Sequence, residues 1–212
     1  MHLQQQFLQS KSNNSDELNL RLHRAISWLI KAEQSEQDLD IQFITLWISF
    51  NAIYAKEFSS NQNGDRISFN EFIAELCRLD KDKQIYNLVW QRFPQSIRVM
   101  LDNRYVFQPF WDYKNGKITE NAWKEYFDKN NKKALTALAN QDTYNILLVV
   151  FDRLYTLRNQ IVHGGATYNS KVNRSQVKDG CQILLALIPA IIQTVLDNAS
   201  NDWGKPFYPV VE

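Results

Sequence analysis

The chain has 212 residues, of which 44% are hydrophobic and 13% aromatic, enough for one large domain or for one domain with an insertion. Its 24 lysines and arginines nearly cancel its 23 aspartates and glutamates, which excludes a protein that binds nucleic acid through a broadly basic face. Any RNA site would therefore have to be a local basic pocket.

The few cysteines and histidines set limits on redox and metal chemistry. Cys77 and Cys181 lie far apart in apolar helical segments, which is typical of reduced, buried thiols in an intracellular protein. No tight ligand spacing is present, so we expect neither a metal nor a cofactor. The chain starts with no signal-peptide pattern, and no apolar run reaches the ~20 residues needed to span a bilayer. We therefore expect a cytoplasmic protein with no membrane partner.

The N-terminal third predicts a polar arm followed by two helices. Residues 1–14 are glutamine-rich and indicate a flexible or loosely docked arm. Ser15 or Asp16 can cap a helix that runs to about residue 34, where apolar residues recur at helical spacing. A second helix is expected over 41–58. It is apolar almost all round, so it should be central to the core.

Asn51 falls within the apolar stripe of that second helix. A buried amide needs hydrogen-bond partners. One interpretation is a hydrogen bond between helices, and the other is a polar group that helps to line a functional site. The sequence leaves both open.

The middle of the chain predicts shorter helices and one aromatic stretch. Residues 59–66 are rich in turn-forming residues and should be a loop. Helices are expected over 67–79, 83–92, 95–101 and 119–139. The aromatic residues of 103–116 are expected in the core, although nucleobases could also stack on such a cluster. We interpret 60–140 as a helical and loop insertion.

The most informative stretch is the helix expected over 145–163. Its apolar residues form one broad stripe, and the pair Gly164-Gly165 should end it. After a loop, a last apolar helix is expected over 172–198. The tail 201–212 should be extended, with Trp203 or Phe207 packing back onto the helices. The pattern predicts an all-α protein.

Three polar residues mark the end of the 145–163 helix. Arg158 falls within the apolar stripe, whereas Asn159 and His163 share an edge roughly 100–140° away around the axis. One interpretation is structural: Arg158 reaches the rim or pairs with a buried carboxylate, and His163 is a cation favoured at a helix C-terminus. The other interpretation is that the three residues form a site.

These residues also form a recognisable motif. Residues 158–163 (RNQIVH) comprise an arginine, a polar residue, a few residues of any kind and a histidine, on a long apolar helix before a glycine stop. In this context the motif resembles the signature of the HEPN superfamily of all-helical domains. Upstream, 25–32 (AISWLIKA) and 43–55 (FITLWISFNAIYA) are similar to the first two helices of its Apea-like branch. The resemblance implies one HEPN-like helical bundle over 15–200, with the 60–140 insertion before the motif helix.

Such a residue set suits metal-independent RNA cleavage. The ribose 2′-hydroxyl attacks the adjacent phosphorus and leaves a 2′,3′-cyclic phosphate end, so the protein needs only acid–base groups and an anion clamp. His163 would be the general acid or base, Arg158 the phosphate clamp, and Asn159 the group that orients the histidine or a ribose hydroxyl. One copy looks insufficient, because acid and base should act on opposite sides of the phosphorus. The HEPN resemblance implies a homodimer whose motif helices face each other across one composite site.

Two hypotheses from different classes follow. The first is a HEPN-type endoribonuclease that acts on RNA, as a toxin or defence effector with an antitoxin or other partner protein. The second is a non-catalytic helical dimerisation module that binds a partner protein or a nucleotide, with Arg158 and His163 in its interface. An exposed His163 in a shared, positively lined cleft would favour the first, and a buried His163 would favour the second.

Overall fold

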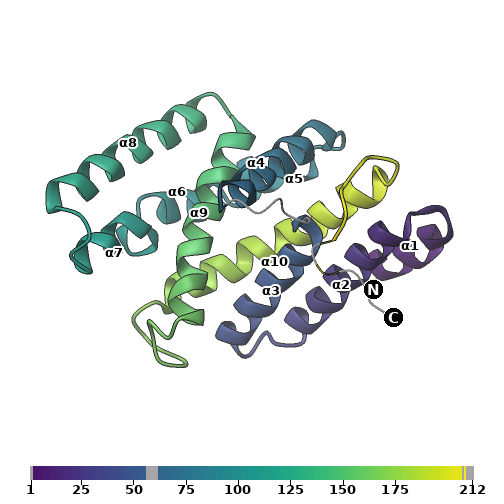
Figure 1. Cartoon of the computed structure of the whole chain (residues 1–212), viewed down its shortest axis with the longest axis horizontal. Coiled ribbons are helices and arrows are strands. Elements are labelled where there is room, and N and C mark those ends of the chain that lie inside the picture. Colours follow the sequence, from purple (N-terminus) through teal and green to yellow (C-terminus); the bar gives the residue numbers. More distant parts are fainter. Residues whose placement is uncertain (1, 56–61, 207, 209–212) are drawn as a thin grey trace. The chain divides into compact units, whose positions relative to one another are not determined.

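The computed structural model is all-α, as the sequence predicted (Figure 1). It describes residues 2–55, 62–206 and 208, with side chains described again from residue 67 onward. No β-strand occurs in that part of the chain. The apolar periodicity of the sequence therefore gave the correct fold class.

The chain divides into two compact units, and the boundaries between them fall within helices. The first comprises Met1–Ile85 and Cys181–Glu212, and the second comprises Tyr86–Gly180. This division differs from the expected single domain over 15–200 with an insertion at 60–140. Residues 62–85 group with the N-terminal helices, whereas the motif helix groups with residues 86–140.

The first unit is built around two long helices that pack along each other, α2 and α3. Its elements are α1 (His2–Ser10), η1 (Lys11–Asn13), α2 (Asp16–Glu33), α3 (Leu39–Tyr54), α4 (Gln62–Leu79), the start of α5 (Gln84–Asn87), and residues 181–197 of α10 (Arg174–Asp197). The Ser15 hydroxyl accepts a hydrogen bond from the Leu18 amide at 3.2 Å, which confirms the predicted cap. Asp38 caps α3 in the same way.

The N-terminal residues are more ordered than their composition suggested. Where we expected a flexible or loosely docked arm, residues 2–10 form α1. Phe7 is buried and its ring stacks on His23, with ring centroids 6.5 Å apart. One aromatic side chain thus anchors an otherwise polar helix to α2.

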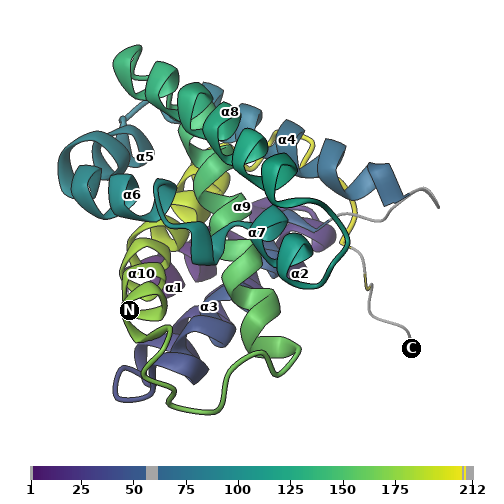
Figure 2. The ribbon, with the colours of Figure 1, turned by 90° about the vertical axis from the view of Figure 1, so that its left-hand side faces the viewer.

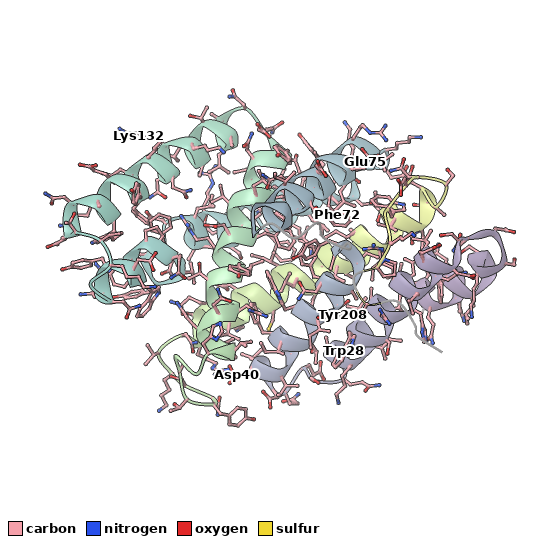
Figure 3. All side chains as sticks on the ribbon, in the orientation of Figure 1. Trp28, Asp40, Phe72, Glu75, Lys132 and Tyr208 are labelled. Carbon is pink, nitrogen blue, oxygen red and sulfur yellow. The ribbon has the colours of Figure 1, made fainter. Side chains whose placement is uncertain are left out.

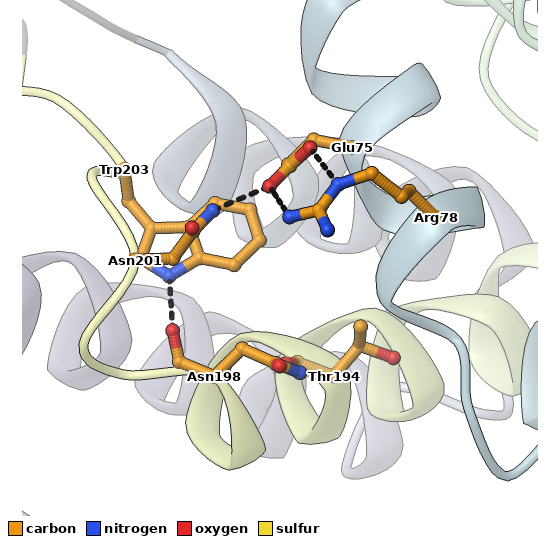
Figure 4. A network of polar contacts seen from close by, with 6 residues as sticks. All are labelled: Glu75, Arg78, Thr194, Asn198, Asn201 and Trp203. Carbon is orange, nitrogen blue, oxygen red and sulfur yellow. Dashed lines mark hydrogen bonds and ion pairs between the residues drawn. The ribbon is translucent and has the colours of Figure 1, made fainter.

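Aromatic side chains and the C-terminal segment close the first unit. Phe72 of α4, labelled in Figure 3, packs edge-on against Trp203. Trp203 is 5% exposed and donates from its indole nitrogen to the Asn198 carbonyl at 3.0 Å (Figure 4). The Asn201 amide donates to Glu75 at 2.7 Å (Figure 4). The prediction that Trp203 packs back is confirmed, and Phe207 lies outside the described residues.

The second unit surrounds α9. Its elements are the end of α5, η2 (Leu88–Arg92), α6 (Pro94–Leu101), η3 (Arg104–Val106), α7 (Gln108–Lys114), α8 (Glu120–Ala139), α9 (Thr143–Val162) and residues 174–180 of α10. Helix α9 packs against α6, η3 and α8, and α7 packs against α8 (Figure 2). The lysines of α8 are solvent-exposed, as Lys132 illustrates (Figure 3).

The largest differences from the predicted helix boundaries lie on either side of residue 60. Helix α4 begins at Gln62, so residues 62–66 are helical where a loop was expected. Helix α3 ends at Tyr54 because Ala55 adopts an extended conformation, and residues 56–58 of the predicted helix lie outside the described part. The loop predicted over 59–66 is therefore wrong for residues 62–66, and its residues 59–61 lie outside the described part of the chain.

One described helix, α10, has the length and apolar composition of a membrane span. The sequence analysis had found no sufficiently long apolar run, because Pro189 and Gln193 interrupt it. Of its most apolar window, 61% is buried inside the protein. Core helices commonly show the same pattern, so this feature is weak evidence for a membrane association.

Candidate functional site

The last turn of α9 brings Arg158 and Asn159 into direct contact. Both side chains are half-buried, and Nη1 of Arg158 donates a hydrogen bond to Oδ1 of Asn159 at 2.9 Å. The helical count had placed them about 100° apart, but the long arginine side chain bends along the helix surface to its neighbour. None of the ion pairs among the described residues involves Arg158. The guanidinium thus keeps most of its donors for a ligand.

His163 is the C-cap residue of α9 and is exposed. Gly164 follows with φ +70°, the left-handed conformation that glycine adopts without strain. Its amide donates to the Ile161 carbonyl at 3.2 Å, and the Gly165 amide donates to the Gln160 carbonyl at 2.7 Å. These two bonds form a Schellman motif, which confirms the predicted glycine stop. The turn holds the backbone of His163 while its imidazole remains in solvent.

Apolar side chains share the edge of α9 that carries Asn159 and His163. At ~100° per residue, Tyr155, Val162 and His163 all fall within roughly 60° of Asn159 around the axis. Tyr155 is 51% exposed and Val162 is 49% exposed. The predicted site residues therefore lie on a surface that is partly apolar, which is a feature of protein–protein interfaces.

Asn51 belongs to the first unit, on α3, whereas the three motif residues belong to the second. It is half-buried, and none of the hydrogen bonds recorded for the described residues uses its side-chain amide. The expected bond between helices is thus absent from the described part of the chain. Its assignment as a site-lining residue stays a prediction.

A second arginine of α9, Arg153, is 0% exposed, and it was not among the residues predicted from the sequence. Its Nη2 donates to the Asn130 side chain at 2.7 Å and to the Leu101 carbonyl at 3.5 Å, and its guanidinium lies 4.4 Å from the ring centroid of Phe107. Burial lowers the pKa of Arg153 to about 10, opposed by the neighbouring carboxylate of Asp152. Arg153 therefore ties α8, the end of α6 and the segment after η3 to α9.

A local signal for this burial exists in the sequence. Val149 and Leu157 lie four residues before and after Arg153, so apolar residues flank it on the same face of the helix. Both are buried. An arginine between such neighbours is expected to enter the core and to need neutral or acidic oxygen partners there.

The aromatic stretch after α6 docks on the motif helix. Nε2 of Gln160 donates to the Tyr105 carbonyl at 2.6 Å, and the Trp111 indole donates to the same oxygen at 2.8 Å. Phe107 and Phe110 are buried, which confirms the core interpretation for them. Tyr105 is 46% exposed, so one aromatic ring of this stretch faces solvent beside α9.

A groove of about 700 Å³ lies in the first unit, between α1, η1, α2 and the C-terminal segment. Its charged lining is mixed, with Lys11, His23 and Lys205 alongside Asp16 and Glu17. It contains none of the predicted site residues, and its balanced charge favours no single class of ligand.

The motif residues thus occupy one turn of α9, partly exposed and close to an aromatic segment. Comparisons with protein-family models, with curated proteins and with solved structures give no match. The assignment to HEPN therefore stays a prediction that rests on the residues of the motif and the helices around it. Within the described residues, no group of three or more His, Cys, Asp or Glu side chains is arranged to hold a metal ion.

Proposed function

We propose that this protein is a HEPN-type, metal-independent endoribonuclease that acts as a cytoplasmic homodimer, in the role of a toxin or defence effector. The observation that carries the proposal is the end of α9. There an exposed histidine follows an arginine that is held by a neutral amide rather than by a carboxylate. An arginine without an ion-pair partner can bind a phosphate bidentately, and a nearby imidazole can transfer a proton at neutral pH.

Each residue has a distinct role in this proposal. His163 of one copy accepts the proton of the attacking ribose 2′-hydroxyl as general base, and His163 of the second copy donates a proton to the leaving 5′-oxygen as general acid. Arg158 binds the phosphate and stabilises the charge that builds on it. Asn159 uses Oδ1 to hold the Arg158 guanidinium at 2.9 Å, so its first role is to orient the arginine. This differs from the sequence expectation, in which it oriented the histidine or a ribose hydroxyl.

Dimerisation completes the site, because in-line cleavage needs proton transfer on both sides of the phosphorus. Tyr155 and Val162 support an interface along α9, since these exposed side chains flank Asn159 and His163. Two copies that meet along this edge would bring two arginines and two histidines to one RNA strand.

Replacing Val162 with Asp should then weaken the dimer and lower cleavage although all three motif residues remain. Light scattering combined with gel filtration measures the dimer directly.

The same exposed side chains favour the second candidate, a non-catalytic interaction module that binds a partner protein. The loop after α9 adds Tyr168 and Val172, which are also strongly exposed. In that case Arg158 and His163 would contact the partner rather than RNA. Fold class does not separate the two candidates, so an activity measurement must.

The deciding test is cleavage of a labelled single-stranded RNA in EDTA. His163→Ala and Arg158→Ala should each lower the cleavage rate by about 10²–10⁴-fold, the usual contribution of acid–base catalysis and of charge stabilisation. His2→Ala and Arg98→Ala are matched controls on exposed positions outside the motif and should cleave like the wild type. A folded wild-type dimer that cleaves none of several RNAs would favour the interaction module.

A further inference from the structure

We infer that Tyr105 and Arg104 form a subsite for an unpaired nucleobase and its phosphate, through which the protein holds single-stranded RNA beside the motif helix. The inference rests on the proposed nuclease function and adds a substrate-binding site to it. Neither residue belongs to the motif.

Tyr105 offers a rigid aromatic surface. Its amide donates to the Asn103 side chain at 2.9 Å, and its carbonyl accepts from both Trp111 and Gln160. Its ring packs edge-on against buried Phe110, with centroids 5.6 Å apart. Even with these contacts, 46% of the residue remains exposed. A fixed, exposed ring loses little entropy on binding, and any base can stack on an aromatic face.

Arg104 supplies a cation at the same place. Its guanidinium lies 4.9 Å from the Tyr105 ring centroid, and Nη2 donates to the Tyr105 hydroxyl at 2.9 Å. Arg104 is exposed, and no carboxylate among the described residues forms an ion pair with it. Because the guanidinium lies over one face of the Tyr105 ring, it can bind a phosphate oxygen while a base stacks on the opposite face.

Two cations near the ring favour an anion, and one of them, Lys114, also interacts with the Glu120 carboxylate. Lys114 also lies over the Phe110 ring at 5.7 Å, so two cations flank the ring that supports Tyr105. The aspartate of this segment, Asp112, pairs with Lys117 at 3.6 Å. The chain as a whole carries a net charge of only +1, so this local arrangement matches the kind of RNA site that the composition allows.

Gln160 connects this surface to the proposed catalytic turn. Its side chain binds the Tyr105 backbone at 2.6 Å, and it lies between Asn159 and His163 in the motif itself. Residues three apart on a helix have Cβ atoms about 5–6 Å apart, so Gln160 and His163 are neighbours. A strand whose base stacks on Tyr105 is thereby placed next to the turn that carries His163. The stacked base must be unpaired, which selects single-stranded RNA over a duplex.

The test measures binding of a fluorescein-labelled, 12-nucleotide uridine oligomer to the full chain in EDTA by fluorescence anisotropy, in a His163→Ala background that prevents cleavage. Tyr105→Leu keeps an apolar contact with Phe110 but removes the stacking face, and should raise Kd roughly 10-fold. Tyr105→Trp should bind within about twofold of the unmodified background because it can still stack. Tyr126→Leu changes a tyrosine of α8 that is 53% exposed and should leave Kd unchanged.

Arg104→Gln should lower the slope of log Kd against log salt by about 0.7, the value for one phosphate contact on a single strand.

The outcomes separate this inference from the proposed function. Equal Kd values for Tyr105→Leu and the background would overturn the subsite, and with wild-type cleavage intact the nuclease proposal would stand. Equal losses in Tyr105→Leu and Tyr105→Trp would also overturn it, because stacking would then not be the cause. Thermal unfolding of each variant checks that the segment still docks. If the His163→Ala protein binds no single-stranded RNA, the subsite is refuted and the surface is assigned to a protein partner. Cleavage by the wild type then tests the proposed nuclease function separately.

Discussion

Helix α9 carries one arginine in its middle and another near its C-terminal end, and the two side chains have opposite environments. Arg153 is 0% exposed and contacts three other segments of its unit through Asn130, Leu101 and Phe107. Arg158, five residues later, is half-buried, and its one recorded hydrogen bond within the described chain is to the adjacent Asn159. The Arg153 guanidinium stabilises the fold, and the Arg158 guanidinium remains available to a ligand.

The difference lies in how many donors each environment satisfies. A buried guanidinium without partners is costly, so Arg153 persists because an amide oxygen, a carbonyl, an aromatic face and the Asp152 carboxylate at 3.3 Å surround it. Its Nε still has no partner among the described residues. Arg158 avoids the same cost by remaining partly in water. Burial therefore identifies structural arginines here, and partial exposure identifies candidates for binding.

The first unit contains a counterpart of Arg153. Arg21 is buried, and its guanidinium donates to the carbonyls of Ile53 at 2.7 Å, Ala55 at 3.0 Å and Gly204 at 3.1 Å. Two of these oxygens lie at the C-terminal end of α3, where carbonyls lack helical partners. Burial lowers the pKa of Arg21 to about 10. Both buried arginines thus rely chiefly on neutral oxygens.

The largest expected effect on stability comes from Arg153→Ala. The substitution leaves a cavity and removes the donors to Asn130 and Leu101, so it should lower the free energy of unfolding by about 3–5 kcal/mol. Urea denaturation measures this change. Arg98→Ala, at an exposed position of α6, is the matched control and should stay within about 0.5 kcal/mol of the wild type. If Arg153→Ala lowered the free energy of unfolding only slightly, Arg153 would not be the structural arginine that distinguishes the middle of α9 from its end.

The next effect concerns Arg21→Met, which keeps the apolar stem but removes all donors to the three carbonyls. We expect a loss of about 2–3 kcal/mol in the free energy of unfolding, because buried carbonyls at a helix end become unsatisfied. Arg24→Met alters a neighbouring, less buried arginine and should cost no more than about 1 kcal/mol. Equal losses in both variants would show that stem packing, and not the hydrogen bonds, stabilises this end of α3.

A smaller effect is expected at the helix stop. Gly164→Ala places a Cβ in the left-handed region, although no atom lies within 4 Å of that Cβ. Conformational strain alone should therefore cost about 1–2 kcal/mol in the free energy of unfolding. Gly164→Asn should cost less, because asparagine tolerates this conformation. Differential scanning calorimetry on the pair would refute the strain explanation if both variants melted at the wild-type temperature.

The smallest effect on stability is expected from His163→Ala, at the exposed end of the helix. Its free energy of unfolding should stay within about 0.5 kcal/mol of the wild type, as for other exposed positions. Chemical denaturation under the conditions of the cleavage assay gives this value. A loss comparable to that of Arg153→Ala would mean that His163 serves the fold, and the functional interpretation of the turn would lose its basis.

Apolar periodicity, caps and glycine stops predicted most of the helices. The side-chain contacts that were not predicted join residues distant in the sequence. The cap at Ser15 and the stop at Gly164 follow from neighbouring residues, and both were predicted correctly. Two partners of Arg153, Asn130 and Leu101, lie 23 and 52 residues away, and the bond between Gln160 and Tyr105 spans 55 residues. Such pairings depend on how α6, η3 and α8 pack on α9, which periodicity within one helix does not specify.

We propose that the exposed turn of α9 is catalytic. The most direct test is mass-spectrometric analysis of the RNA ends produced in EDTA by the wild-type protein and by an equally stable His163→Ala variant. We predict 2′,3′-cyclic phosphate ends from the wild type and none from the variant. Cyclic phosphate ends formed equally by both, or products with 3′-hydroxyl ends, would contradict the claim and leave the turn as part of an interface.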